Sequence, residues 1–354
     1  MMKLVKINST FMRVISDFIF YSLGLIGNLL FWKSLSIGFC FLVCNIDLFA
    51  QAVPAKEENI PFLVTFGKQS DISWGDDDFS QVFFFGCPVD FKEPFYIRVF
   101  DPECSGANDE LKGDPSTTTK YSIYGGIGCI SGKDATAIDP KGDYKSGNLL
   151  ASRSFSQEKE FDNAWYTFGP FNPGDGEFYP KYGGIIFKII CEGIKGDDGN
   201  LYRYFISTSS SANYSVPGGN AFTFEYSFRL HSEPFQTSHV YPFIDDKVIS
   251  VGQRNFDWDD DGFIKIFSVA TIGEKMATSG DNSWATSVYI VKEKEKLKSL
   301  DVQFTKDSSR NVRNNNVVYS MHNQYGELLP FYTVPIGGVP KFEGTAVAKP
   351  IKKK

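Results

Sequence analysis

The chain has 354 residues, of which 42% are hydrophobic and 16% aromatic, and its formal net charge at pH 7 is −6. This length is enough for two ordinary domains with large apolar cores. The charge argues against a nucleic-acid partner, because phosphate binding requires a clustered basic face and the one basic cluster is the terminal run Lys352–Lys354.

The first 52 residues differ from the rest and are predicted to be a secretory signal peptide. Lys33 precedes the apolar run Leu35–Phe49, and the segment Ala50–Ala52 follows it. A basic residue, an apolar run and an A-x-A end are typical of an export signal. Cleavage after Ala52 would give a mature chain beginning at Val53. That chain would be exported to the periplasm, the cell surface or the medium.

A membrane anchor is the alternative for the same region. Residues 11–31 form a largely apolar stretch long enough to span a bilayer, and Arg13 and Asp17 lie near its start. If this stretch is retained, it would anchor the protein in the membrane. If it is removed, we expect the protein to have no integral membrane role. The long segment ahead of the signal-like run also agrees with a true start at Met12.

Residues 53–232 are predicted to form the first of two β-sandwich domains. Short apolar runs separated by turn residues favour strands over helices. Between Phe222 and Arg229 aromatic residues alternate with Thr, Glu, Ser and Arg, which predicts one half-buried strand. The predicted strands are 61–66, 80–89, 94–101, 120–126, 148–155, 164–171, 183–194, 201–209 and 221–231. The number of strands and the longer loops favour a large, jelly-roll-like sandwich.

Turn residues further divide the chain. Gly196–Asn200 separates two strand patterns and predicts a β-hairpin. A break at 231–239, with Pro234 and few apolar residues, predicts a domain boundary. After it, residues 238–335 carry seven or eight short strand patterns and are predicted to be a smaller β-sandwich. Residues 336–354 are predicted to be a flexible basic tail. The predicted fold class is therefore all-β, with two β-sandwich domains after the N-terminal segment.

Four cysteines follow the predicted signal, and all lie in the first predicted domain: Cys87, Cys104, Cys129 and Cys191. An even number of cysteines in an exported chain is compatible with disulfides, and their spacings match no zinc pattern. Cys104 and Cys129 both fall in sequences typical of loops, so a Cys104–Cys129 disulfide is predicted. Four buried free thiols are the alternative.

One acidic stretch, "NFDWDDDGFIKI", predicts a calcium site. Asp257, Asp259 and Asp261 alternate and Gly262 follows, as in the first half of an EF-hand-type calcium loop. Calcium takes six to eight oxygen ligands, and alternate aspartates on a tight loop converge on one point. The three carboxylates and the Phe263 carbonyl are therefore the predicted ligands, with calcium as the one predicted cofactor.

The second half of the loop departs from the EF-hand pattern, because Ser268 stands where a bidentate Glu is required. The stretch resembles the shorter DxDxDG loops of β-rich extracellular proteins, in which other segments complete the shell. Asp245 and Asp246 are upstream candidates for this. A solvated acidic turn before a strand is the alternative interpretation.

The sequence carries no recognisable catalytic frame. Its three histidines form no HExxH motif, and there is no G-x-S-x-G elbow or Walker loop. The predicted function is a non-catalytic, exported bacterial cell-envelope or surface protein, calcium-stabilised, that binds protein or carbohydrate. The alternative is a carbohydrate-active enzyme or carbohydrate-binding module that uses two carboxylates or exposed Trp and Tyr rings. Candidate residues are Glu158, Glu160, Glu177, Glu192, Trp74, Trp165, Trp258 and Trp284.

The predicted calcium loop has a measurable consequence for stability. A ligand that binds only the folded state stabilises it by about 2.7 kcal/mol at a hundredfold excess over Kd. We expect millimolar calcium, compared with chelator, to raise the melting temperature of the wild-type protein more than that of Asp259→Ala. An equal rise in both proteins would identify the loop as an acidic turn only.

Overall fold

A computed structural model gives the fold and describes residues 51–307 and 315–344. In these ranges the chain is built from antiparallel strands joined by loops and five short 3-10 helices, with no α-helix. No helix in these ranges is long and apolar enough to cross a membrane. The described residues belong to one compact unit, Phe49–Lys354. The prediction of an all-β sandwich is confirmed.

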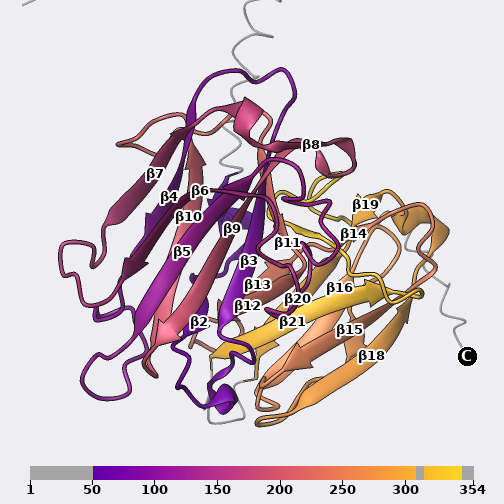
Figure 1. Cartoon of the computed structure of the whole chain (residues 1–354). Coiled ribbons are helices and arrows are strands. Elements are labelled where there is room, and N and C mark those ends of the chain that lie inside the picture. Colours follow the sequence, from indigo (N-terminus) through magenta and orange to yellow (C-terminus); the bar gives the residue numbers. More distant parts are fainter. Residues whose placement is uncertain (1–50, 308–314, 345–354) are drawn as a thin grey trace, which may run out of the picture. The chain divides into compact units, whose positions relative to one another are not determined.

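The largest sheet has nine strands in the described part of the chain and runs through both predicted domains (Figure 1). Its order is β18-β15-β21-β12-β2-β10-β4-β7, and β1 pairs with β10 at the side. The strands are β1 (Ala52–Val53), β2 (Phe62–Phe66), β4 (Phe95–Phe100), β7 (Trp165–Phe171), β10 (Gly199–Ser207), β12 (Glu225–Arg229), β15 (Ser250–Phe256), β18 (Trp284–Ile290) and β21 (Asn316–Asn323).

A seven-stranded sheet is formed by residues of the first predicted domain and one late strand. Its order is β22-β11-β3-β9-β5-β6, and β8 pairs with β9. The strands are β3 (Ser80–Cys87), β5 (Thr118–Gly125), β6 (Asn148–Phe155), β8 (Glu177–Tyr179), β9 (Gly184–Lys195), β11 (Asn220–Thr223) and β22 (Phe331–Tyr332).

Two smaller sheets complete the fold in the described residues. One has the order β13-β20-β16-β17, and the other is the pair β14-β19. Their strands are β13 (Thr237–Val240), β14 (Phe243–Ile244), β16 (Gly262–Phe267), β17 (Glu274–Met276), β19 (Lys298–Ser299) and β20 (Asp301–Lys306). The 3-10 helices are η1 (Lys56–Glu58), η2 (Ile72–Trp74), η3 (Pro173–Asp175), η4 (Pro180–Tyr182) and η5 (Glu293–Glu295).

Aromatic rings fill the space between the two large sheets. Phe83 of β3 contacts Tyr204 of β10 and Tyr226 of β12, with ring centroids 5.9 and 5.3 Å apart. Tyr121 of β5 meets Tyr202 of β10 at 5.4 Å. All three pairs are edge-to-face, an arrangement worth about 0.5–1.5 kcal/mol per pair beyond the burial of area. These contacts form the centre of the first sandwich.

The four-stranded sheet packs against the same large sheet through Phe304 of β20. Its ring lies 5.3 Å from Phe228 of β12, 5.0 Å from Tyr319 of β21 and 5.4 Å from Trp258. Each of these side chains is buried. The nine-stranded sheet therefore packs against both the seven-stranded and the four-stranded sheet, in each case through aromatic side chains.

Strands from both predicted domains lie side by side in this shared sheet. β12, from the range 53–232, pairs with β21, from the range 238–335, and the register joins Tyr226 to Tyr319. Backbone hydrogen bonding therefore crosses the break predicted at 231–239. Sequence periodicity shows where a strand starts and stops, but not which strand becomes its neighbour.

The predicted hairpin at Gly196–Asn200 is wrong. Both of its strands exist, but β9 belongs to the seven-stranded sheet and β10 to the nine-stranded sheet. The connection crosses between sheets, because the Asp198 carboxylate accepts hydrogen bonds from the backbone N–H of Lys112, Ser116 and Thr117. These bonds hold the turn against the loop before β5.

The predicted Cys104–Cys129 disulfide is also wrong, because all four described cysteines are free and buried. Cys104 donates its N–H to Ser156 O, beyond the end of β6 that pairs with Thr119 in β5. Cys129 follows Gly125, at the opposite end of β5, and its thiol lies 3.5 Å from Tyr124 O. An eight-residue strand separates the two, a span of about 25 Å, so no bond can form.

The two ends of the described unit are tied into the fold. The buried Gln51 side chain exchanges hydrogen bonds with the backbone of Val216, and Ala52 pairs with Phe205. The predicted cleavage position after Ala52 therefore falls inside β1, while residues 1–50, including the predicted anchor 11–31, lie outside the described residues. In the predicted tail, Glu343 N–H donates to Val269 O at 2.9 Å, and residues 345–354 lie outside the described part.

A buried carboxyl in η1, that of Glu58, makes stability depend on pH. Glu58 accepts hydrogen bonds from Ala55 N–H and the Tyr226 hydroxyl at 2.6 and 2.8 Å. Burial raises its pKa from 4.5 to about 8 despite these bonds. The proton held in the folded state stabilises it fully below pH about 4.5, and this contribution is lost as pH rises through about 8.

We therefore expect Glu58→Gln to stabilise the protein at pH 9 relative to wild type by roughly 2–4 kcal/mol, with a much smaller difference at pH 5. Urea unfolding at the two pH values measures this. The adjacent, exposed Glu57 is the matched control, and Glu57→Gln should follow the wild type at both pH values. A Glu58→Gln effect of equal size at pH 5 and pH 9 would contradict the assignment.

Candidate functional site

The predicted calcium loop brings two of its three aspartates together. Carboxylate oxygens of Asp257, Asp259 and Asp281 all lie within 4.8 Å of one another, and Asp261 is not part of this group. Asp257 also accepts a hydrogen bond from Asn282 N–H at 2.7 Å. Asp281 lies in the loop between β17 and β18. No local sequence pattern predicts that it lies beside Asp257.

The other two predicted ligands take different places. Asp261 is buried and lies near Lys306, whose pKa burial lowers to about 8 although the Asp261 charge opposes the shift. Phe263 lies within β16 opposite Thr305, and its ring has the ammonium groups of Lys265 and Lys275 at 5.5 and 5.4 Å. Calcium at this loop stays a prediction.

The tryptophans do not form a flat binding platform. Trp258 is buried, and the other three rings each carry a cation on one face. Lys112 lies 3.8 Å above Trp74, Arg98 4.9 Å above Trp165 and Arg254 4.3 Å above Trp284. Such stacking stabilises the surface and covers one of the two faces of each ring.

The four glutamates singled out in the sequence do not gather either. Glu158 pairs with Arg153 and Glu192 with Lys145, each at 2.7 Å. Glu177 accepts hydrogen bonds from the backbone N–H of Ile130 and Ser131, and Glu160 is exposed.

A groove of about 460 Å³ lies beside the β11–β12 junction. Volumes of this size are typical of small-ligand sites. Its walls come from segments far apart in the sequence: the β5–β6 loop, η4, the β11–β12 junction, β14 and the β21–β22 connection. The lining residues used below are Lys133, Asp134, Lys181, Tyr182, Phe224, Phe243, Asp245, Asn323, Glu327 and Tyr332.

Packed aromatic rings form one side of the groove. Tyr182 contacts Phe224 at 5.9 Å and stacks on Tyr179 at 5.6 Å, with 21° between the ring planes. Phe243 meets Tyr332 at 6.1 Å. Tyr182 and Phe243 are only partly buried, so their rings remain accessible from the groove. These contacts fix the rings in place before any ligand arrives.

Polar and charged groups of both signs complete the lining. Asn323 Nδ2 donates to Glu327 at 2.8 Å, and the Asp245 carboxylate accepts from Lys247 N–H at 2.8 Å. Lys181 lies 5.0 Å from the Tyr182 ring centroid. Partial burial lowers the pKa of Lys181, but Tyr182 and Glu327 oppose this and raise it overall, so the ammonium stays charged.

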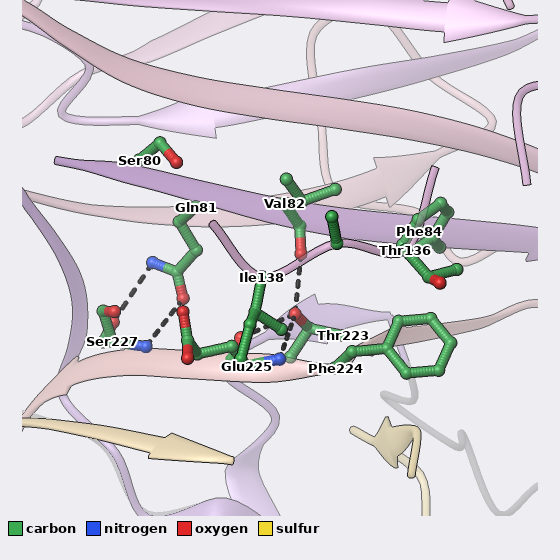
Figure 2. Close-up of a pocket in the computed structure, with 11 residues that line it drawn as sticks. Ser80, Gln81, Val82, Phe84, Thr136, Ile138, Thr223, Phe224, Glu225 and Ser227 are labelled. Atoms are coloured by element: carbon green, nitrogen blue, oxygen red, sulfur yellow. Dashed lines mark hydrogen bonds between the residues drawn. The ribbon is translucent and has the colours of Figure 1, made fainter. Parts of the chain in front are cut away.

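A second, much smaller cavity shares Thr136, Ala137 and Phe224 with the groove. It lies where β3 and β12 diverge, and we call it the wedge (Figure 2). It has room for about 10 Å³, enough for a single water or ion. Its lining is Ser80, Gln81, Val82, Phe84, Thr136, Ala137, Ile138, Thr223, Phe224, Glu225 and Ser227.

The wedge exists because a predicted single strand is two strands. The prediction of one half-buried strand from Phe222 to Arg229 is wrong. The first strand, β11, pairs with β3. The second, β12, pairs with β2 and β21, and Phe224 lies between the two strands. Phe222 and Phe224 pack with Phe84, whereas Tyr226 and Phe228 belong to the main core. The polar residues Thr223, Glu225 and Ser227 are buried as well.

Side chains replace the missing pairing between β3 and β12. The Gln81 amide donates to Ser227 O at 3.1 Å and accepts from Ser227 N–H at 3.0 Å (Figure 2). The Thr223 hydroxyl donates to Val82 O at 2.6 Å. Unpaired backbone groups in a buried place cost roughly 1–3 kcal/mol each, so these contacts allow the strands to part.

Three aspartates precede β3, whose first residue Ser80 lines the wedge, and Glu225 is the one carboxylate in that lining. Carboxylate oxygens of Asp76, Asp77 and Asp78 lie within 4.8 Å of one another. Asp78 accepts from Ser80 N–H at 2.8 Å. Burial raises the pKa of Glu225 well above 4.5, and the charges of Asp77, Asp78 and Asp139 raise it further. Burial also raises the pKa of Asp77 to about 6.

Sequence pattern alone does not predict these positions. The "WGDDDF" run, with its three adjacent aspartates, lacks the alternation of a calcium loop. Glu225 stands at a position where the alternating pattern predicts exposure to solvent.

Comparison of the chain with protein-family models, with curated proteins and with solved structures finds no match.

The role of Gln81 can be tested by removing its amide. Gln81→Met keeps the length of the side chain but leaves Ser227 N–H and C=O without their partner. We expect a loss of roughly 2–4 kcal/mol in unfolding free energy, measured by urea denaturation. Gln236→Met is the control, because Gln236 is exposed. Equal, small effects from both changes would show that the Gln81 amide does not replace strand pairing.

Proposed function

We propose that the protein is an exported binding protein of the cell envelope or cell surface, and that its groove takes a carbohydrate. The observation that carries this proposal is the composition of the 460 Å³ groove, in which partly exposed aromatic rings face carboxylates, an amide and ammonium groups. A sugar has apolar ring faces and hydroxyls that both donate and accept, so it matches such a lining.

The mixed charges of the groove favour a neutral ligand. Lys133 and Lys181 are offset by Asp134, Asp245 and Glu327, so no strong field of one sign would select an anion or a cation. Export is supported by Lys33, the Leu35–Phe49 run and Ala50–Ala52. Calcium at the Asp257–Asp259 loop would stabilise such a protein outside the cell.

A carbohydrate-active enzyme is the second candidate. Three carboxylates line the groove, and each accepts a hydrogen bond: Asp134 from Asp143 N–H, Asp245 from Lys247 N–H and Glu327 from Asn323 Nδ2. Glycoside hydrolysis requires two carboxylates on either side of the bond that breaks. Release of reducing ends from an oligosaccharide, abolished by Glu327→Gln, would select the enzyme over the binding protein.

Binding is tested with the Tyr182 ring. We expect at least one neutral oligosaccharide of a varied panel to bind the wild-type chain in isothermal titration calorimetry. Tyr182→Ala should weaken that binding about tenfold, equivalent to about 1.4 kcal/mol.

Tyr214→Ala is the matched control, because Tyr214 is 64% exposed and does not line the groove. It should bind as wild type does. Equal weakening by both changes, or no binding by any sugar of the panel, would contradict the proposal.

A further inference from the structure

A group of three carboxylates lies where two neighbouring strands of the nine-stranded sheet meet their loops. β4 pairs with β7, and the register joins Phe100 to Trp165. Asp101 follows β4 directly, Glu103 lies in the same loop, and Asp162 lies in the loop that leads into β7. One carboxylate oxygen of each lies within 4.8 Å of the other two. The group therefore joins two loops that are distant in sequence.

Two of these carboxylates are fully buried, and one has an oxygen without a partner. Asp101 and Glu103 are each 0% exposed. Glu103 Oε2 accepts a hydrogen bond from the Ser105 hydroxyl at 2.6 Å, but Oε1 is buried and has no hydrogen-bond partner among the described residues. Burial of a carboxylate is strongly unfavourable unless its oxygens are bonded. The carboxylate that Glu103 adds to the group therefore still requires a donor or a cation.

Hydrogen bonds from the two loops hold the other carboxylates in position. Asp101 accepts from Asn163 N–H at 2.9 Å and from Asn108 Nδ2 at 2.6 Å. Asp162 Oδ1 accepts from Asn163 Nδ2 at 2.7 Å. The backbone at Gly106 lies so close to Asp162 that an added Cβ would be 2.3 Å from its Oδ1. These donors are neutral, so they orient the carboxylates without balancing their charge.

No cationic side chain balances the group within the described ranges 51–307 and 315–344. None of the ion pairs found there includes one of its three carboxylates. Arg203 of β10, the strand beside β4, instead lies 4.6 and 4.7 Å from the ring centroids of Phe62 and Phe100. Three negative charges this close repel one another, and burial removes the solvent that would screen them.

We infer that Asp101, Glu103 and Asp162 bind one divalent cation between the β4–β5 loop and the β6–β7 loop. The side-chain ligands are all oxygens, which suits the hard ions calcium and magnesium rather than zinc or copper. Calcium–oxygen bonds measure about 2.3–2.6 Å, so ligands on opposite sides of one ion lie up to about 5 Å apart. The separations within the group, at most 4.8 Å, agree with one ion shared by all three carboxylates.

Calcium is the favoured ion. Magnesium requires near-octahedral geometry and usually keeps several waters, whereas calcium accepts irregular arrangements of protein oxygens. Asp101 and Glu103 are fully buried, which leaves little access for an ion that keeps its waters. The site is separate from the Asp257–Asp259–Asp281 group, which lies in other loops.

The test is calorimetric titration of the full chain, first treated with chelator, with calcium chloride and separately with magnesium chloride. We expect one calcium-binding event that Glu103→Gln and Asp162→Asn each weaken about tenfold or more, because a carboxylate ligand becomes a neutral amide. The two residues lie on different loops, so loss of the same event in both variants is what a bridging ion requires. Glu93→Gln is the matched control, because Glu93 is exposed and outside the group. Asp259→Asn changes another acidic group and should leave this event unchanged.

A second measurement guards against variants that are merely damaged. In chelator, Glu103→Gln should melt at the wild-type temperature or above, because it removes one of three charges that repel one another. Calcium should raise the melting temperature of this variant less than that of wild type. The inference would be overturned if wild type bound neither ion, if Glu103→Gln or Asp162→Asn bound calcium as tightly as wild type, or if Glu103→Gln melted below wild type in chelator. Tighter binding of magnesium than of calcium would overturn the choice of ion.

Discussion

The break between strands β11 and β12 at Phe224 is the constraint on which the rest of the structure depends. One continuous sequence pattern leaves the seven-stranded sheet as β11 and enters the nine-stranded sheet as β12. Two aromatic residues before and at the interruption pack with Phe84, and two after it enter the main core. The same segment thereby links both large sheets, and β12 continues the pairing into β21.

This crossing leaves backbone N–H and C=O groups without a neighbouring strand, and side chains bond them at two places. Near Ser227 the Gln81 amide takes the place of a neighbouring strand. At Glu225 the Thr223 hydroxyl accepts a hydrogen bond from the backbone N–H at 3.3 Å. The groove lies on the other side of Phe224, so segment 133–138 contributes to both cavities.

Much of the fold follows from local sequence, because strands and turns are local features. The alternation of apolar and polar residues, the Gly- and Asp-rich turns and the lack of helical periodicity together predict an all-β sandwich. Strand partners were not predictable in this way, since pairing is decided by contacts between distant residues. The hairpin at Gly196–Asn200 shows this: its turn sequence is ordinary, and hydrogen bonds to Asp198 from residues 112–117 send the two strands into different sheets.

The sites were harder to predict for the same reason. The alternating Asp257 and Asp259 were visible, but Asp281 reaches them from another loop. The Cys104–Cys129 pairing failed because loop-like sequence says nothing about which end of a strand a loop occupies. Glu225 was hidden by its own regular pattern, which normally places a glutamate in solvent.

The most direct test of this account is a crystal structure of the full chain. We predict two separate strands, Asn220–Thr223 and Glu225–Arg229, with the Gln81 amide at 3.1 and 3.0 Å from the backbone O and N of Ser227. One continuous strand from Phe222 to Arg229, or a Gln81 side chain turned out to solvent, would contradict it.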